Sequence, residues 1–437
     1  MLSTQPQACM PVRFSRLTHT ALASAAALAG FSPLGQAAFF EDSSATLETR
    51  NMYFNRDFRD GTSAQQSKRD EWAQGFMLNL QSGYTDGTVG FGVDALGMLG
   101  VKLDSSPDRT GTGLLPTHDD GRAANEYSKL GLTGKVRASK SELQLGTIST
   151  FLPIAFASPT RLLPQTFRGA YLKSQEIDDL TLHLGWLDRI NLRDSTNYQK
   201  MSVASPNGRF KGAAESDRFS FVGGDYAWSP QLTLKYYHAE LADLYRKDFY
   251  GFVGNHPIGP GSLKSDFRLF VTGEDGAAKA GPVDNRNAAL MLTYSLGAHK
   301  FGAGYMQLTG KTAMPYLFGT EPLVITEGTL SSEFLNPKER SWQVRYDYNF
   351  AALGLTGLNG MLRYVSGDNI ELPKLGGSNL KESEKDIELN YVLQGTPLKG
   401  LVLRVRNAWY RNDFTAQASH RDDNELRVNV DYTWKLW

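Results

Sequence analysis

Hydrophobic and polar residues alternate along much of this chain. In residues 342–350 every second side chain is apolar, beginning with Trp342 and Val344, and the side chains between them are polar or charged. The same period of two appears in residues 129–138, 386–394 and 426–436. Strict alternation is typical of strands with one apolar and one polar face. The runs extend over about 9–12 residues, longer than most globular strands and long enough to cross a bilayer.

Further segments of this kind follow one another from the first to the last third of the chain. Together with the four runs above they make seventeen recognisable strands, and single-chain bacterial barrels use even strand numbers. The pattern therefore predicts an all-β protein, a transmembrane antiparallel β-barrel of 18 strands, with 16 as the alternative. The additional segments lie near 44–54, 72–82, 88–100, 141–148, 170–176, 180–190, 218–228, 231–240, 264–271, 286–296, 299–308, 359–367 and 400–411.

Two long stretches, 149–170 and 309–340, lack this alternation. Loops longer than about 12–15 residues are usually functional or disordered. Both stretches contain large apolar residues and proline, so we expect them to fold inward rather than to be disordered.

The N-terminal segment is typical of a secretory signal peptide. Arg13 and Arg16 precede an apolar stretch over 21–31, and small residues follow up to Ala37 and Ala38. A basic start, a short apolar core and an Ala-x-Ala-like end define such peptides. We expect cleavage after Ala37 or Ala38, with residues 1–37 as signal peptide and 38–437 as one barrel domain.

Composition excludes several classes of protein. The whole chain has 46 basic and 46 acidic residues, and it shows no basic excess that would favour a nucleic-acid partner. The single cysteine, Cys9, lies in the expected signal peptide, so the exported chain would form no disulfide. After cleavage no run of about 18 apolar residues remains for a transmembrane helix. Any membrane that the chain occupies would then be crossed by a closed barrel.

Catalytic and metal-binding patterns are absent from the sequence. No nucleophile-elbow, Walker A, zincin or EF-hand motif occurs. His183 and His238 fall in separate predicted strands, whereas a metal site needs convergent ligands. We therefore expect neither enzyme activity nor a cofactor.

Arginine recurs in the alternating strands. Arg345, Arg363, Arg404 and Arg406 fall on the polar faces. Arginine stays charged, and its fork binds a carboxylate with two hydrogen bonds. A line of arginines in a pore would lower the barrier for an anion and pass it between sites. Alternatively, these are ordinary lumen cations paired with Asp or Glu.

Several motifs, in order along the chain, closely resemble the OprD porin family, the substrate-specific outer-membrane channels of pseudomonads and relatives. The resemblance covers essentially the whole mature chain. It is carried by Phe39-Phe40-Glu41-Asp42-Ser43-Ser44, Arg50-Asn51-Met52-Tyr53-Phe54-Asn55-Arg56-Asp57-Phe58, Arg161-Leu162-Leu163-Pro164-Gln165-Thr166-Phe167, residues 339–350, Arg363-Tyr364-Val365 and Gly367-Asp368-Asn369-Ile370.

The resemblance implies a monomeric 18-stranded barrel embedded in outer-membrane lipid, with the third and seventh external loops forming a constriction. It also implies a "basic ladder" of Arg and Lys on one pore wall, facing an electronegative, partly tyrosine-lined wall. The positions that match the ladder by motif are Arg50, Arg56, Arg161 and Arg193. Arg404 and Arg406 match it by strand position, and Lys129 is a further candidate. The candidates for the facing wall are Tyr316, Glu321 and Glu327.

These observations favour a passive, substrate-selective channel. The expected solutes are small carboxylates, because no dense acidic cluster is evident in the loops. The alternative within the same class is a channel for basic amino acids or dipeptides. Hypotheses from other classes are a barrel enzyme, which would need a Ser–His pair on adjacent strands, a plugged barrel serving as scaffold or adhesin, and a soluble β protein.

Overall fold

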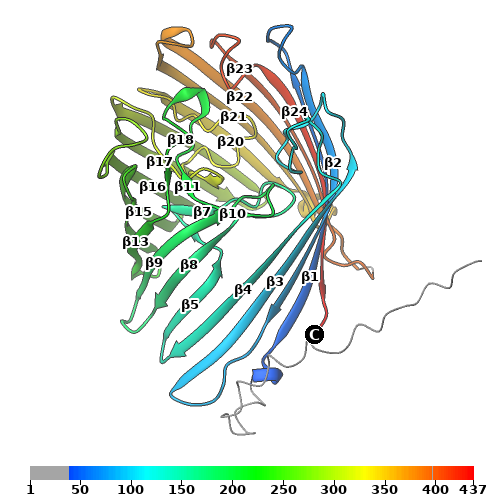
Figure 1. Cartoon of the computed structure of the whole chain (residues 1–437), viewed down its shortest axis with the longest axis vertical. Coiled ribbons are helices and arrows are strands. Elements are labelled where there is room, and N and C mark those ends of the chain that lie inside the picture. Colours follow the sequence, from blue (N-terminus) through cyan, green and yellow to red (C-terminus); the bar gives the residue numbers. More distant parts are fainter. Residues whose placement is uncertain (1–38, 396) are drawn as a thin grey trace, which may run out of the picture.

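One β-sheet closes on itself to form a barrel (Figure 1). The computed structural model describes residues 39–395 and 397–437, so the expected signal peptide and its cleavage site lie outside the described residues. Strand β1 pairs with β2 on one side and with β24 on the other, and all neighbouring strands are antiparallel. The barrel strands are β1 (Ser44–Phe58), β2 (Lys68–Gln81), β3 (Val89–Asp104), β4 (Glu126–Ala138), β5 (Ser141–Ile148), β8 (Thr166–Ser174), β9 (Leu180–Asn191), β13 (Phe219–Ser229), β14 (Leu232–Leu241), β15 (Tyr245–Ile258), β16 (Gly261–Glu274), β17 (Asp284–Leu296), β18 (His299–Gly310), β20 (Arg340–Asn349), β21 (Leu358–Leu372), β22 (Gly377–Val392), β23 (Val402–Asn412) and β24 (Asp423–Lys435).

These 18 strands confirm the predicted fold class and strand number. The remaining elements are short and lie in the connections between barrel strands. They are β6 (Phe151–Leu152), β7 (Ala155–Ala157), β10 (Tyr198–Gln199), β11 (Met201–Ser202), β12 (Glu215–Ser216), β19 (Thr320–Glu321), and the 3-10 helices η2 (Pro206–Gly208) and η3 (Phe350–Leu353).

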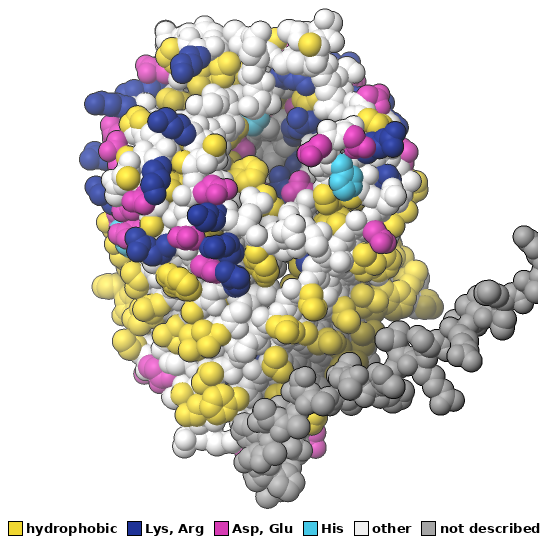
Figure 2. All heavy atoms as spheres, viewed as in Figure 1, with side chains coloured by type: hydrophobic (Ala, Val, Ile, Leu, Met, Phe, Trp, Pro, Cys, Tyr) yellow, Lys and Arg dark blue, Asp and Glu magenta, His cyan; other side chains and the backbone are white. Residues whose placement is uncertain are grey.

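The outer face of the wall is apolar, as the alternation predicts. Leu130 and Leu132 are 72% and 59% exposed, and Trp342 and Val344 point the same way from β20. In Figure 2 hydrophobic side chains form a band across the middle and lower part of the wall, with Lys, Arg, Asp and Glu gathered above it. An apolar band of this kind matches the hydrocarbon region of a bilayer. Among the described residues, no helix has the length and apolarity needed to cross a membrane.

The two ends of the barrel differ in the length of their connections. At one end the strands are joined mostly by short turns, such as 139–140, 230–231 and 297–298. At the other end the connections are generally longer, and we refer to four of them as L3 (149–165), L4 (192–218), L7 (311–339) and L9 (413–422). Short turns mark the periplasmic end of outer-membrane barrels and long loops the extracellular end.

Strand β15 is the one barrel strand that the sequence pattern did not reveal. Its inward side carries Tyr245, Lys247 and Phe249, all buried, while Arg246 and Tyr250 are exposed on the outer side. Each face therefore mixes aromatic and charged side chains, and the period of two disappears. The cause is that the lumen here is filled: Phe249 packs against Phe270 within the hydrophobic cluster beneath the loops.

Loops L3 and L7 fold into the barrel, as expected from their apolar residues. Strand β7 of L3 pairs with β19 of L7. In Figure 1 the label of β7 lies within the barrel. Leu162 and Leu163 of L3, like Leu317 and Phe334 of L7, are fully buried. Burying a side chain of this size is worth about 1.5–3 kcal/mol, so the apolar residues hold the loops inside.

Candidate functional site

The constriction is where L3 and L7 meet. Glu321, on β19, accepts hydrogen bonds from the hydroxyl groups of Ser158 at 2.5 Å and Thr160 at 3.1 Å, both in L3. Loop L4 joins them, because the backbone N–H of Ala204 donates to the carbonyl oxygen of Tyr316 at 2.9 Å. The three loops thus form one body that divides the lumen into an upper and a lower cavity.

The upper cavity, of about 860 Å³, is lined by residues of L3, L4, L7 and L9. It brings together six of the twelve site residues that the sequence predicted: Arg56, Arg161, Arg193, Tyr316, Glu321 and Glu327. Arg69 and Arg427 also line it. The wall from β1, β2 and L3 is therefore basic, and the acids come from L4, with Asp194 and Glu215, and from L7.

Three guanidinium groups at this cavity have no carboxylate partner. Arg69, Arg161 and Arg193 form no ion pair within the part of the chain that the structure describes, whereas Arg56 and Arg427 share Glu425. The Nε of Arg161 donates to the carbonyl oxygen of Thr112 at 2.9 Å. Uncompensated cations at the edge of a cavity attract anions.

Arg161 lies at the centre of this positive region. Its guanidinium stands 5.0 Å from the ring centroid of Phe54. Burial, followed by the cations Arg427 and Arg193, lowers the pKa of Arg161 well below its usual range. The neighbouring cations repel one another, and a bound anion would relieve that repulsion.

Arg193 reaches the cavity because Gly113 leaves room for it. A Cβ at Gly113 would stand 3.2 Å from the Nε of Arg193, and the residue has a φ of +75°, which favours glycine. The main chain of Arg193 is held by Tyr127, whose hydroxyl lies 3.1 Å from its carbonyl oxygen. The guanidinium itself makes no hydrogen bond to any described residue.

Charged residues of the wall follow one cross-strand row. Arg345 lies opposite Arg363, Arg363 opposite Asp386, and the row continues through Ala408 to Glu425, which lies opposite Arg56. Arg56 in turn lies opposite Arg69 on β2. Because barrel strands tilt by about 35–45° and stand about 4.8 Å apart, six such steps climb roughly 20 Å. The row therefore rises from the lower cavity to the upper one.

Every arginine of this row except Arg69 is paired with a carboxylate. Arg363 is buried and donates to Asp386 at 2.7 Å and to the carbonyl oxygen of Glu327 at 3.1 Å. Arg345 makes two hydrogen bonds to Asp347, at 2.8 and 2.7 Å. The lower cavity, of about 560 Å³, is lined by both arginines and by Glu327.

Four of the predicted ladder residues line neither cavity. Arg404 pairs with Glu388 at 3.0 Å, and Arg406 donates to Asn429 at 3.1 Å. Arg50 donates to Asp431 and to the carbonyl oxygens of Pro159 and Arg161 in L3.

Lys129 is the fourth of these residues, and it is buried. Its Nζ donates to the carbonyl oxygens of Pro164 and Leu192. Arg50 and Lys129 thus fasten inward loops to the wall.

The sequence did not single out Arg69, Arg427 or Arg268. The alternation of apolar and polar residues puts Arg427 on the polar face of the last strand, as it does Arg404 on its own strand. Arg69 lies in a run of charged residues, Lys68–Glu71, where no alternation distinguishes inward from outward side chains. Arg268 has the inward parity of its strand, but its partner Glu327 lies 59 positions away in L7.

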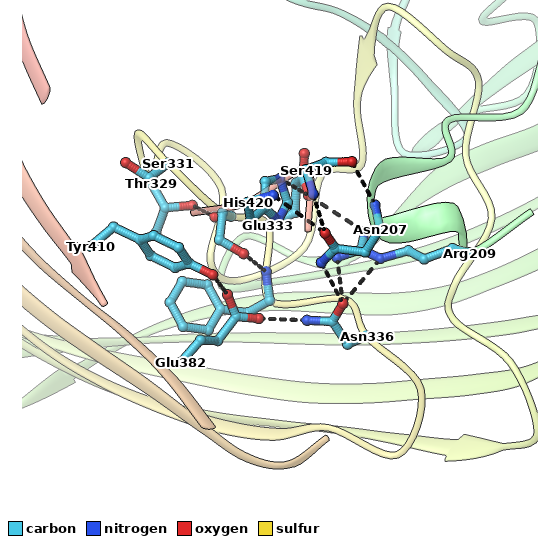
Figure 3. A network of polar contacts seen from close by, with 12 residues as sticks. Asn207, Arg209, Thr329, Ser331, Glu333, Asn336, Glu382, Tyr410, Ser419 and His420 are labelled. Carbon is cyan, nitrogen blue, oxygen red and sulfur yellow. Dashed lines mark hydrogen bonds and ion pairs between the residues drawn. The ribbon is translucent and has the colours of Figure 1, made fainter. Parts of the chain in front are cut away.

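A polar network joins L4, L7 and L9 beside the upper cavity (Figure 3). Asn336 donates to Glu382 at 2.6 Å, and Arg209 donates to the amide oxygen of Asn336 at 3.1 Å. Glu333 lies 3.7 Å from His420 of L9. Burial raises the pKa of Glu333, but His420 and Arg209 outweigh it and bring that pKa below its usual value.

No metal centre accompanies these groups: in residues 39–395 and 397–437, no three His, Cys, Asp or Glu side chains are placed to hold an ion.

Comparison with known proteins identifies the family. A family model described as outer membrane porin, OprD family, matches residues 37–436. The Porin-like protein GalP of Pseudomonas putida is 38% identical over 92% of this chain and 95% of its own length. The crystal structure of OccK9 (OpdG) of Pseudomonas aeruginosa is 43% identical and superimposes with a TM-score of 0.86, covering 91% of this chain and all of that one. OpdK of Pseudomonas aeruginosa, solved with vanillate, is 38% identical with a TM-score of 0.84, over 91% of this chain and all of its own. The chain therefore belongs to the OprD family of outer membrane porins.

Proposed function

We propose that this porin takes up small carboxylate-bearing solutes by passive diffusion through an arginine-lined pore. The observation that carries the proposal is the group of three guanidinium ions at the upper cavity, Arg69, Arg161 and Arg193, which no described carboxylate neutralises. A carboxylate that loses its hydration shell in the constriction recovers hydrogen bonds from such groups.

The solute would then follow the cross-strand row of charges. From Arg161 and Arg193 its carboxylate passes to Arg56, and below the constriction to Arg363 and Arg345. Paired arginines along the row hold an anion weakly, so that it leaves as readily as it arrives, which conduction requires. No bond is made or broken, and residues of the barrel wall and of loops L3 and L4 supply every group.

The relatives point in the same direction. The solved OpdK structure contains vanillate, an aromatic compound with one carboxylate group. At 38% identity over nearly the whole chain, a related solute class is a reasonable starting point for this protein.

The alternative is a channel for basic amino acids or dipeptides. One observation favours it: Glu321, Glu327 and Glu333 all line the upper cavity opposite the arginines. However, Glu327 is already paired with Arg268 at 2.8 Å and Glu333 lies beside Arg209 at 3.4 Å. Asp194, Glu215 and Glu321 also line the cavity and form no ion pair with a described residue, so the preference for carboxylates rests on the unpaired Arg161, whose neighbours Arg427 and Arg193 are cations.

Single-channel recording of the purified protein in planar bilayers tests the proposal. We expect anion-selective reversal potentials in a KCl gradient and current block by benzoate. Block by arginine or lysine without block by benzoate would establish the alternative. The absence of any conductance from a correctly folded barrel would refute both.

A further inference from the structure

The lower cavity has charges of its own, on the wall formed by β16, β18, β20 and β21. Arg268 on β16 pairs with Asp266, two residues away on the same face, through hydrogen bonds of 2.9 and 2.8 Å. Arg345 on β20 pairs with Asp347 in the same manner. These two ion pairs leave little net charge on that part of the wall.

Two lysines of this cavity remain without a partner. Lys264 is the fourth residue of β16 and Lys300 the second of β18, so both lie close to periplasmic turns. Neither forms an ion pair or a hydrogen bond with a described residue, and both side chains are exposed to the lumen. The lower cavity therefore carries uncompensated positive charge at its periplasmic side.

Glu327 is the residue shared by the two cavities. It is the single side chain, among the described residues, that lines both of them. Arg268 holds its carboxylate with hydrogen bonds of 2.8 and 3.3 Å, and donates as well to the carbonyl oxygen of Val324 at 3.1 Å. Glu327 is 41% exposed whereas Arg268 is 13% exposed. The carboxylate can thus swing away while the arginine stays in place.

We propose that the lower cavity is a second carboxylate-binding site, reached when the carboxylate of a solute replaces that of Glu327 on Arg268. The inference rests on the proposed uptake of carboxylates and adds a site on a different wall from the upper cations. Glu327 occupies Arg268 between solutes, so that the buried guanidinium keeps its partners at every stage. Lys264 and Lys300 then draw the released anion toward the periplasm.

The cavity also offers a surface for the rest of the solute. Met291 and Ile325 contribute apolar side chains to its lining, and Gly302, which has no Cβ, makes room for the Met291 side chain. A Cβ at Gly302 would lie 2.6 Å from the Met291 Cε. The site fits a carboxylate attached to a compact hydrocarbon or aromatic group better than a bare inorganic anion.

The test compares benzoate block from the two sides of oriented single channels. In Lys264→Gln/Lys300→Gln channels we expect the affinity for benzoate added on the periplasmic side to fall at least fivefold, with block from the extracellular side unchanged. The matched control is Lys235→Gln. Lys235 is the fourth residue of β14, as Lys264 is of β16, but it is paired with Asp225 and does not line the cavity. Glu327→Gln should increase the affinity from both sides, because Arg268 loses its internal competitor.

A crystal of the full barrel soaked in 4-bromobenzoate provides an independent readout. Anomalous bromine density in the lower cavity beside Met291 and Ile325 supports the second site, and its absence at a concentration that fills the upper cavity overturns it. Equal periplasmic block of wild type and the double lysine variant also overturns it. If benzoate blocks from neither side of the wild type, the proposed function itself fails. If it blocks only through the upper cavity, the second site alone is wrong.

Discussion

The guanidinium of Arg56 donates to the carbonyl oxygen of Leu330 at 2.9 Å, so the first strand of the barrel holds the tip of loop L7. Arg427 on the neighbouring strand donates to the same oxygen at 3.0 Å. From the other side, the carboxylate of Glu384 accepts the backbone N–H groups of Leu330, Ser331 and Ser332. Residues that face the pore thus also set the position of the constriction.

Arg56→Met should therefore widen the pore as well as change its charge. A hydrogen bond from a charged donor contributes about 1.5–3 kcal/mol, so its loss should raise the population of displaced loops about tenfold or more. We expect larger and noisier single-channel currents and a weaker anion preference. The measurement is the conductance distribution in planar bilayers.

Arg404→Met is the matched control for this effect. Arg404 is likewise an arginine paired with a carboxylate, Glu388, but it contacts no described residue of L7. It should alter ion selectivity without altering current noise. Similar noise in both variants would show that Leu330 is not held by Arg56.

Arg193→Gln isolates the role of an uncompensated cation in the upper cavity. Because its guanidinium has no hydrogen bond to a described residue, its removal should not disturb packing, and the thermal unfolding midpoint should stay the same. Loss of one charge-assisted contact should lower benzoate affinity about tenfold. Arg168→Gln, at an exposed arginine paired with Asp188, should leave that affinity unchanged.

The barrel was predictable from the sequence because the membrane imposes a strict period. Lipid requires an apolar side chain at every second position, so Arg345 and Arg363 could be assigned to the lumen from parity alone. That signal fails where the lumen is filled with loops, because both faces of β15 then carry aromatic residues. The strand could be found only once Phe249 and Phe270 were seen to pack together.

The candidate site was predictable as a set of residues but not as an arrangement. Parity places Arg50 and Lys129 in the lumen, yet it says nothing of the carbonyl groups of L3 and L4 to which they donate. Those acceptors belong to irregular loops, whose backbone direction no periodic pattern encodes. The pairing of Arg268 with Glu327 could not be predicted from the sequence for the same reason.

Tyr127 should influence solute binding although it does not line the upper cavity. Its hydroxyl lies 2.9 Å from the carbonyl oxygen of Leu114 and 3.1 Å from that of Arg193, so it positions the Arg193 main chain. Tyr127→Phe removes the one hydroxyl proton that these two carbonyl oxygens share, at a cost of about 1 kcal/mol. Benzoate affinity should fall several-fold while KCl conductance stays constant.

Glycine variants of β3 provide a second test of the same contact. A Cβ at Gly100 would lie 2.2 Å from the Tyr127 ring, whereas a Cβ at Gly97 would come no closer than 4.0 Å to its neighbours. Gly100→Ala should therefore reproduce the loss of affinity, and Gly97→Ala should not. Wild-type affinity in Gly100→Ala would contradict the proposed role of the ring.

The contact between L9 and L7 should weaken in acid because of His420. The side chain is buried beside Glu333, Arg209, Glu382 and Arg56. Burial lowers the pKa of His420 below its ordinary value of 6.5, although Glu333 opposes this effect. The neutral ring is the form that packs at pH 7. When folding lowers the pKa of a base, the base contributes stability at a pH above its pKa in the unfolded state. This contribution is lost as the pH falls through its pKa in the folded state.

We therefore expect channel current noise to increase as the pH is lowered from about 6.5, near the unfolded pKa of histidine. His420→Gln keeps a neutral side chain at every pH and should remove the part of this dependence that arises in that range. The measurement is the current variance of single channels between about pH 7.5 and about pH 5, the range over which histidine titrates. If wild type and variant show the same pH profile, the noise does not arise from His420, and the loop contact is insensitive to its protonation.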